Sequence, residues 1–293
     1  MNTLSKEEAL LFHKLMDSLL LFVNQKTGII KNAENMKELH QNNIEKTMLL
    51  RKKIFSNKYT FIDDFIKGNP FNLSQEDLAI ISSWKKWKSG KFFIIKHVPD
   101  FSLFFDSDSK IVCGVKGITD SFEEKFSGYA PVLLDITLIP FKDNIIYDGL
   151  FSPYNISFGA GMIKTLKAES EEAILKSGVI TSLSQPITGK QQDDEEMLRF
   201  YMKSFENKMR YEKEINQLKK RSKELEGIYY QEEGRDFARS FKKSLKEIDI
   251  KGHFAVLNNV IVASGTDEKE LMKAAGKIVP KDKLSWVYTF KVP

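Results

Sequence analysis

The sequence is poor in the residues that most often mark a specific chemistry. It has one cysteine, Cys113, and four histidines, at positions 13, 40, 97 and 253. One cysteine excludes an intramolecular disulfide. The histidines show none of the regular spacing that the ligands of a structural metal have. We therefore expect neither a metal nor a cofactor.

Catalytic and nucleotide-binding signatures are missing as well. The sequence contains no glycine-rich lysine loop, no dinucleotide-binding fingerprint, no zinc-protease helix pattern and no nucleophile elbow. Active sites can also be assembled from distant residues, so each absence alone is modest evidence. Together these absences favour a protein that is not an enzyme.

Long apolar runs are absent too. The longest one near the N-terminus, residues 9–23, is interrupted by His13, Lys14 and Asp17. A helix that crosses a bilayer needs about 20 predominantly apolar residues. The first residues also lack the basic region and the cleavage site of a signal peptide. We expect a cytoplasmic protein that has no contact with a membrane.

The residues that are abundant belong to an ordinary folded protein. Hydrophobic residues make up 42% of the 293 positions and include 22 phenylalanines, which is enough for a sizeable core. Lys and Arg number 45 against 40 Asp and Glu, so the net charge is +5. This small excess permits a nucleic-acid or ribonucleoprotein partner without requiring one.

Residue patterns predict an α+β fold that begins with helices. Residues 1–90 carry helix-capping patterns at Ser5 with Glu8 and at Ser74 with Asp77, and we expect these helices to pack on the next domain. Residues 91–181 alternate β-branched and aromatic runs with short polar turns, which predicts an antiparallel meander. A helix from about Gly161 to Gly178 should cover one face of that sheet.

The second part of the chain has a different character. Residues 182–194 lack periodicity and read as a linker. Residues 195–250 predict long helices: residues 195–226 read as one charged, coiled-coil-like helix that could oligomerise, and an amphipathic helix follows at about 232–248. Residues 251–293 predict a small ββαβ domain.

Two segments resemble known but uncharacterised proteins. The block from Tyr129 to Gly149, continued by Tyr154 to Gly159, resembles a region of a prokaryotic protein family without assigned activity. The tail around residues 254–265, which closes on residues 291–293, resembles a short prokaryotic domain of unknown function. The resemblance implies a bacterial or archaeal origin and no activity.

The densest polar cluster lies between the last strand of the meander and the following helix. It comprises Asp148, Tyr154, Ser157, Gly159 and Gly161. A glycine-rich turn that enters a helix can direct free backbone N–H groups at a phosphate, so this cluster is a candidate ligand site. Alternatively, the glycines only allow tight turns.

Asp135 is a further candidate, because it interrupts an apolar strand. It either lies on the polar face of the sheet or forms a buried acid pair with Asp148 across the hairpin.

A second candidate surface is the helix at about 232–248. Its cations recur at three- and four-residue spacing and should share one broad face, whereas Phe237, Phe241, Leu245 and Ile248 form the opposite stripe. The face either contacts phosphates or an acidic partner, or it is merely solvated. The cations are Arg235, Arg239, Lys242, Lys243 and Lys246.

Three classes of function follow from these features. The first is a non-enzymatic binding or adaptor protein that engages a protein, a nucleic acid or a ribonucleoprotein. The second is an enzyme or a phosphate-ligand sensor that uses residues 148–161. The third is an oligomerisation module built on residues 195–226. We favour the first.

Overall fold

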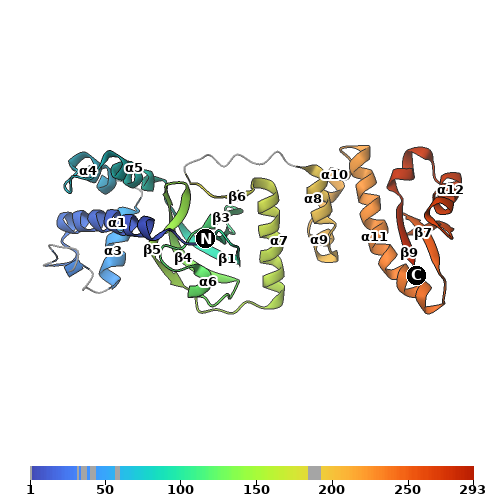
Figure 1. The fold of residues 1–293 in the computed structure, drawn as a ribbon, viewed down its shortest axis with the longest axis horizontal. Coiled ribbons are helices and arrows are strands. Elements are labelled where there is room, and N and C mark those ends of the chain that lie inside the picture. Colours follow the sequence, from blue (N-terminus) through green and yellow to red (C-terminus); the bar gives the residue numbers. More distant parts are fainter. Residues whose placement is uncertain (1, 32, 34–37, 40–43, 57–59, 184–192) are drawn as a thin grey trace. The chain divides into compact units, whose positions relative to one another are not determined.

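Helices occupy the first part of the chain, as the capping patterns predicted. In the computed structural model, which describes residues 2–31, 33, 38–39, 44–56, 60–183 and 193–293, Ser5 caps the first helix and its Oγ accepts a hydrogen bond from the Glu8 amide (3.2 Å). Ser74 caps another in the same way. The elements of this part are α1 (Lys6–Thr27), α3 (Ile44–Ile54), α4 (Thr60–Gly68), α5 (Gln75–Ser83) and the 3-10 turn η1 (Trp84–Lys86) (Figure 1).

The next strands close into a small barrel. Strand β1 pairs with β2 and β4, β4 pairs with β5, β5 touches β3, and β3 returns to β2. The order β4-β1-β2-β3 is a Greek key, because the fourth strand returns to lie beside the first. The strands are β1 (Lys88–His97), β2 (Ser102–Asp106), β3 (Ile111–Val115), β4 (Val132–Phe141) and β5 (Asn144–Pro153).

The predicted strand positions are confirmed, but the simple antiparallel meander is wrong. On the edge opposite β2, strand β3 runs parallel to β5 at Val115 and Ile145, and parallel to β6 (Val179–Ile180) at Val112 and Cys113. These parallel contacts arise because two connections cross over: one carries the short helix α6 (Phe122–Lys125) and the other carries α7 (Ala160–Ser177). Runs of strand-forming residues in the sequence do not show which strands pair when they are far apart along the chain.

Asp148 of the predicted polar cluster and the adjacent Gly149 do not lie in a turn that closes a strand. Both lie inside β5, in a bulge. Leu138 of β4 pairs with Tyr147, and Ile136 pairs with Phe151, so β5 has three residues where β4 has one. Gly149 has φ +95°, a conformation that favours glycine and suits a bulge.

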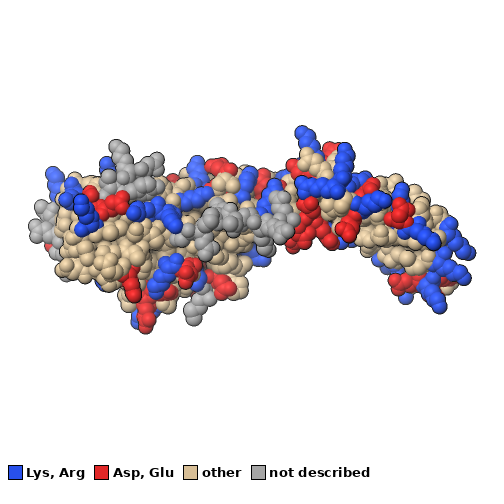
Figure 2. Space-filling view, turned by 90° about the horizontal axis from the view of Figure 1, so that it is seen from above, with Lys and Arg blue, Asp and Glu red and all other residues tan. Residues whose placement is uncertain are grey.

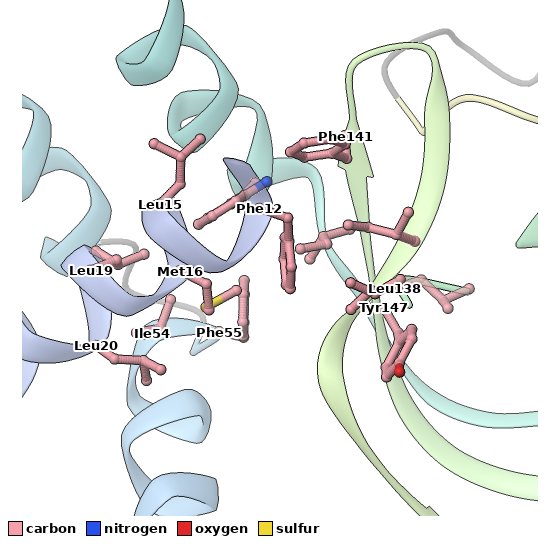
Figure 3. Packing of buried hydrophobic residues seen from close by; sticks show 14 of the residues in the cluster. Phe12, Leu15, Met16, Leu19, Leu20, Ile54, Phe55, Leu138, Phe141 and Tyr147 are labelled. Atoms are coloured by element: carbon pink, nitrogen blue, oxygen red, sulfur yellow. The ribbon is translucent and has the colours of Figure 1, made fainter. Parts of the chain in front are cut away.

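One hydrophobic core joins the N-terminal helices to the barrel. Phe12 of α1 packs edge-on against Trp84 and against Phe141 of β4, with ring centroids 6.0 Å apart in both contacts (Figure 3). Phe122 of α6 fills the barrel interior, where it contacts the rings of Phe104 and Tyr147.

Helix α3 adds a short apolar stripe to this core. Leu50 and Ile54 of α3 are buried, whereas Ile44 and Leu49 are mostly exposed.

Helix α7 covers one outer face of the barrel, as predicted, and it ends before Gly178. Leu166 and Ala173 of α7 pack on Leu103, Phe105 and Val112 of β2 and β3. Figure 1 shows α7 beside the strands. The outer surface of these two strands is therefore already occupied by the chain itself.

The chain divides into two compact units, residues 1–190 and 191–293. The division falls within the predicted linker 182–194, of which residues 184–192 lie outside the described part. The second unit begins with helices, and the prediction of one long helix over residues 195–226 is wrong. Ser204 and Ser222 each cap a new helix, because a serine hydroxyl bonds an N–H group of the next turn. The helices are α8 (Asp194–Tyr201), α9 (Phe205–Arg210), α10 (Glu212–Lys219) and α11 (Lys223–Glu247).

The C-terminal ββαβ arrangement is confirmed. Strands β7 (Gly252–Leu257) and β8 (Val260–Gly265) form a hairpin through Asn258 and Asn259, both with positive φ. After α12 (Glu268–Ile278), β9 (Tyr288–Val292) pairs with the other edge of β7. Helix α11 covers one face of this sheet and α12 the other, because neighbouring residues of β7 pack against different helices.

Two glycines let α11 approach the rest of its unit closely. A Cβ atom on Gly227 would lie 2.7 Å from the Trp286 ring, and one on Gly234 would lie 2.7 Å from the Tyr288 Cβ. Both distances are too short for any larger residue. Glycine disfavours a helix, and this close packing explains why α11, which is otherwise rich in charged residues, contains two glycines.

Candidate functional site

The structure does not bring the predicted polar cluster together. Asp148 lies in the β5 bulge and faces helix α3. Tyr154 and Ser157 follow the end of β5 and line a different cavity of about 520 Å³. Gly159 caps α7 and Gly161 lies in its first turn.

Neither of the two α7 glycines is required by its surroundings. A Cβ atom on Gly159 or Gly161 would meet nothing within 4 Å, and neither residue has a positive φ. The first turn of α7 also carries no acidic residue. The phosphate-binding role of this turn stays a prediction.

Asp148 forms a buried ion pair that the sequence did not suggest. Its Oδ2 lies 3.7 Å from Nη1 of Arg51, and the two side chains are only 6% and 12% exposed. Within the described part of the chain, Nε and Nη1 of Arg51 have no hydrogen-bond partner. Gly149 makes room for the guanidinium, since a Cβ there would lie 3.0 Å from Nη1.

Burial dominates the electrostatics of this pair. It raises the pKa of Asp148, because a buried carboxylate loses its hydration, and the positive charge of Arg51 offsets only part of the effect. Burial also lowers the pKa of Arg51, although a guanidinium stays protonated in proteins. The charges attract each other, yet both are costly to hold in this environment.

Asp135 and Asp148 line the same cavity, of about 310 Å³, between α3 and the outer face of the barrel. The side chain of Asp148 is buried, whereas Asp135 is exposed at the cavity. The two acids therefore line one cavity but do not form the buried pair that one interpretation of the sequence proposed, because Asp135 is exposed and pairs with Ser152 in the strand register.

The sequence missed Arg51, the residue that gives this cavity its buried positive charge. Its only local signal is its position beside Leu50 and three residues before Ile54, both of which are buried. An arginine next to the buried residues of a helix suggests that it has a buried partner, but the sequence does not show which residue that partner is.

The predicted cationic face of α11 divides in two. Arg235 is partly buried and bound to the buried carboxylate of Glu232. Lys242 is partly buried, with its Nζ over the Phe290 ring (5.6 Å). These two residues serve packing. Arg239, Lys243 and Lys246 remain exposed.

We call these three exposed residues the α11 cationic face. The opposite side of the helix packs on β7 and β9 through Phe237, Ala238, Phe241 and Leu245, as the apolar stripe predicted, whereas Ile248 is 64% exposed and lies beyond the helix end. Figure 2 shows Lys and Arg side chains interspersed with Asp and Glu over the visible face of the C-terminal unit.

Two acids of α11 lie beside this face, of which Glu247 is exposed and Asp236 is largely engaged elsewhere. Asp236 binds Nζ of Lys208 at 2.9 Å and reaches Arg239 only at 3.5 Å. The Arg239 side chain is 71% exposed, so its contact with Asp236 is a weak surface pair. Within the part of the chain that the structure describes, Lys243 and Lys246 have no ion-pair partner.

The described residues lack two further features. No group of three or more His, Cys, Asp or Glu side chains there could hold a metal ion. Among the helices of the described part, none combines the length and apolarity needed to cross a membrane.

Comparison with known proteins adds no relative: the chain matches no protein-family model, no curated protein and no solved structure.

Proposed function

We propose that this protein is a non-enzymatic binding protein that contacts the phosphate backbone of nucleic acid through the α11 cationic face. One observation carries the proposal. Arg239, Lys243 and Lys246 stand exposed in a helical row, and Asp236, the acid beside Arg239, is bound by Lys208, which leaves the exposed Glu247 as the acid next to Lys246.

The spacing of the row suits a regular chain of charges. Successive cations of the face are four and three residues apart, which corresponds to a rise of about 6 Å and about 4.5 Å along the helix. Duplex DNA presents a phosphate about every 3.4 Å along each strand. A polyanion with closely spaced charges can therefore meet every member of the row.

The surroundings of the row favour nucleic acid over an acidic protein. Its exposed neighbours include Glu247 and two serines, Ser240 and Ser244, and the Ser244 hydroxyl donates weakly to the Ser240 carbonyl at 3.4 Å. Serine, lysine and arginine are typical phosphate contacts. A protein interface would instead have aromatic or apolar side chains at its centre, whereas Phe237 and Phe241 are directed into the sheet.

The barrel of the first unit is a less suitable site. Five-stranded Greek-key barrels can bind oligonucleotides on the outer face of their second and third strands. Here that face carries Leu103, Phe105 and Val112 and is packed under α7. The proposal therefore rests on the second unit.

The test is fluorescence anisotropy of labelled duplex DNA and single-stranded RNA with the full chain. The informative variant is Arg239→Glu/Lys243→Glu/Lys246→Glu, which leaves Lys242 in its contact with Phe290. The matched control is Lys269→Glu/Lys273→Glu/Lys277→Glu, three exposed lysines of α12 in the same unit. Loss of binding in the first variant alone supports the proposal.

The segment 195–226 offers a weaker case for self-association. A coiled coil needs a continuous helix with a repeating apolar seam. Three short helices occupy most of this segment, and Leu198, Ile215 and Leu218 are buried within the unit. Oligomerisation through this segment stays a prediction without a structural basis in its favour.

A further inference from the structure

The cavity between α3 and the barrel has walls of opposite charge. Its volume is about 310 Å³, at the lower end of the range for small-molecule sites. Helix α3 contributes Arg51 and Lys52, and the barrel contributes Asp135 from β4 and Asp148 from β5. A ligand in this space meets cations on one side and carboxylates on the other.

The inner charges of the cavity already compensate each other in part. Arg51 and Asp148 are the buried members, at 3.7 Å from one another. The outer members, Lys52 and Asp135, are both exposed. Among the described residues neither of the outer two forms an ion pair, so their charges are available to a ligand.

The nearest cation on the neighbouring strand does not neutralise Asp135. Lys91 of β1 stands opposite Asp135 in the sheet register. Its Nζ lies 5.4 Å from the centroid of the Tyr154 ring, in a cation–π contact. Lys91 is thus directed to another partner, and Asp135 keeps its charge for the cavity.

Apolar and hydroxyl side chains complete the lining. Phe55, Trp87 and Phe151 supply apolar surface. Ser89 and Thr137 lie side by side on paired strands, and their hydroxyls are hydrogen-bonded to one another at 2.5 Å. The cavity therefore combines two opposed charged rims with an aromatic wall, which is an arrangement suited to a small dipolar molecule.

We propose that this cavity binds a small zwitterion of the α-amino acid class, whose carboxylate faces Arg51 and Lys52 and whose ammonium group faces Asp135. An apolar or aromatic side chain of the ligand lies against Phe55, Trp87 and Phe151. This site is independent of the nucleic-acid face on α11 and belongs to the other unit.

The experiment is a thermal-shift screen of the full chain with the twenty L-amino acids, followed by calorimetric titration of those that raise the Tm. The informative variants are Lys52→Met and Asp135→Asn, at exposed positions where the fold does not depend on the charge. Each should weaken binding by roughly tenfold or more, because each removes a charge-assisted hydrogen bond to the ligand. The matched controls, Lys53→Met in α3 and Asp143→Asn in the β4–β5 turn, lie outside the cavity and should bind as wild type.

A second panel of mononucleotides and dicarboxylates distinguishes the class of ligand. Stabilisation by these compounds and by no amino acid would overturn the zwitterion proposal. It would also be overturned if an amino acid bound equally well to wild type, Lys52→Met and Asp135→Asn. A titration of the Arg239→Glu/Lys243→Glu/Lys246→Glu protein should give unchanged amino-acid affinity, because the two sites are separate.

Discussion

Arg51 of α3 and Asp148 of β5 form a buried ion pair that links the helical layer to the barrel, with 3.7 Å between Nη1 and Oδ2. Two segments far apart in the sequence thus meet through opposite charges in a mainly apolar environment. Removing one partner of such a pair leaves an uncompensated buried charge, which costs about 3–5 kcal/mol.

We therefore expect Arg51→Met to lower the free energy of unfolding by about 3 kcal/mol. The double variant Arg51→Met/Asp148→Asn should be more stable than Arg51→Met alone, because it removes the unpaired carboxylate as well. Urea unfolding of the wild type, both single variants and the double variant measures the coupling. Additive effects of the two substitutions would show that the residues do not form a stabilising pair.

The raised pKa of Asp148 predicts a pH dependence of stability. Since the folded pKa lies above the unfolded one, the native state holds more protons between these two values. Stability should fall as pH rises through the folded pKa of Asp148, and Asp148→Asn should lack this component. The unfolding free energy of the wild type minus that of Asp148→Asn should therefore become smaller as pH rises from about 4, the ordinary pKa of an aspartate. If this difference instead becomes larger as pH rises, the pKa of Asp148 is not raised in the folded protein.

Two glycines of the second unit should respond to alanine in opposite ways. Gly234→Ala places a Cβ 2.7 Å from the Tyr288 Cβ and should destabilise by about 1–3 kcal/mol, as overpacking does. Gly276→Ala in α12 meets nothing within 4 Å and should stabilise by about 0.5–1 kcal/mol through helix propensity. Equal effects in thermal unfolding would mean that α11 does not approach β9 as closely as described.

Cys113 should be chemically inert in the folded protein. It is fully buried in β3, and burial raises the pKa of its thiol to about 12. Because the thiolate is the reactive form, a disulfide reagent at about pH 8 should leave the native protein unmodified and should react with one thiol after denaturation. Rapid reaction without denaturant would show that β3 opens readily.

Local signals in the sequence predicted the elements well. The Ser5–Glu8 and Ser74–Asp77 patterns mark true helix starts, and Asn258-Asn259 marks a true hairpin. Each of these depends on hydrogen bonds or backbone angles within a few residues. One comparable signal was overlooked, because Ser121 and Glu124 form a capping box at the start of α6.

Features that depend on distant residues were not predicted. The parallel contact of β3 with β5 and the bulge at Gly149 depend on how strands align after the barrel closes. Arg51 becomes significant only because α3 lies against β5. Residues 195–226 form short helices because the hydroxyls of Ser204 and Ser222 cap new helices. This capping outweighs the strong helix propensity of the residues on either side.

Candidate site residues show the same limit. Helical periodicity correctly placed Arg239, Lys243 and Lys246 away from the apolar stripe of α11. It could not show that Arg235 is held by Glu232 or that Lys242 lies over Phe290. Those contacts depend on other parts of the second unit. They reduce the five cations that were candidates for a binding surface to three.

The most direct measurement of the central claim is the salt dependence of nucleic-acid binding by anisotropy. Each phosphate contact contributes about 0.7–0.9 to the slope of log K against log salt concentration. Replacing Arg239, Lys243 and Lys246 by Glu should therefore lower the slope by about 2–3 and weaken binding to both probes, whereas the α12 control should keep the wild-type slope. If the wild type binds neither probe at low salt, or if the α12 control loses as much of the slope as the α11 variant, the α11 cationic face is not a nucleic-acid interface.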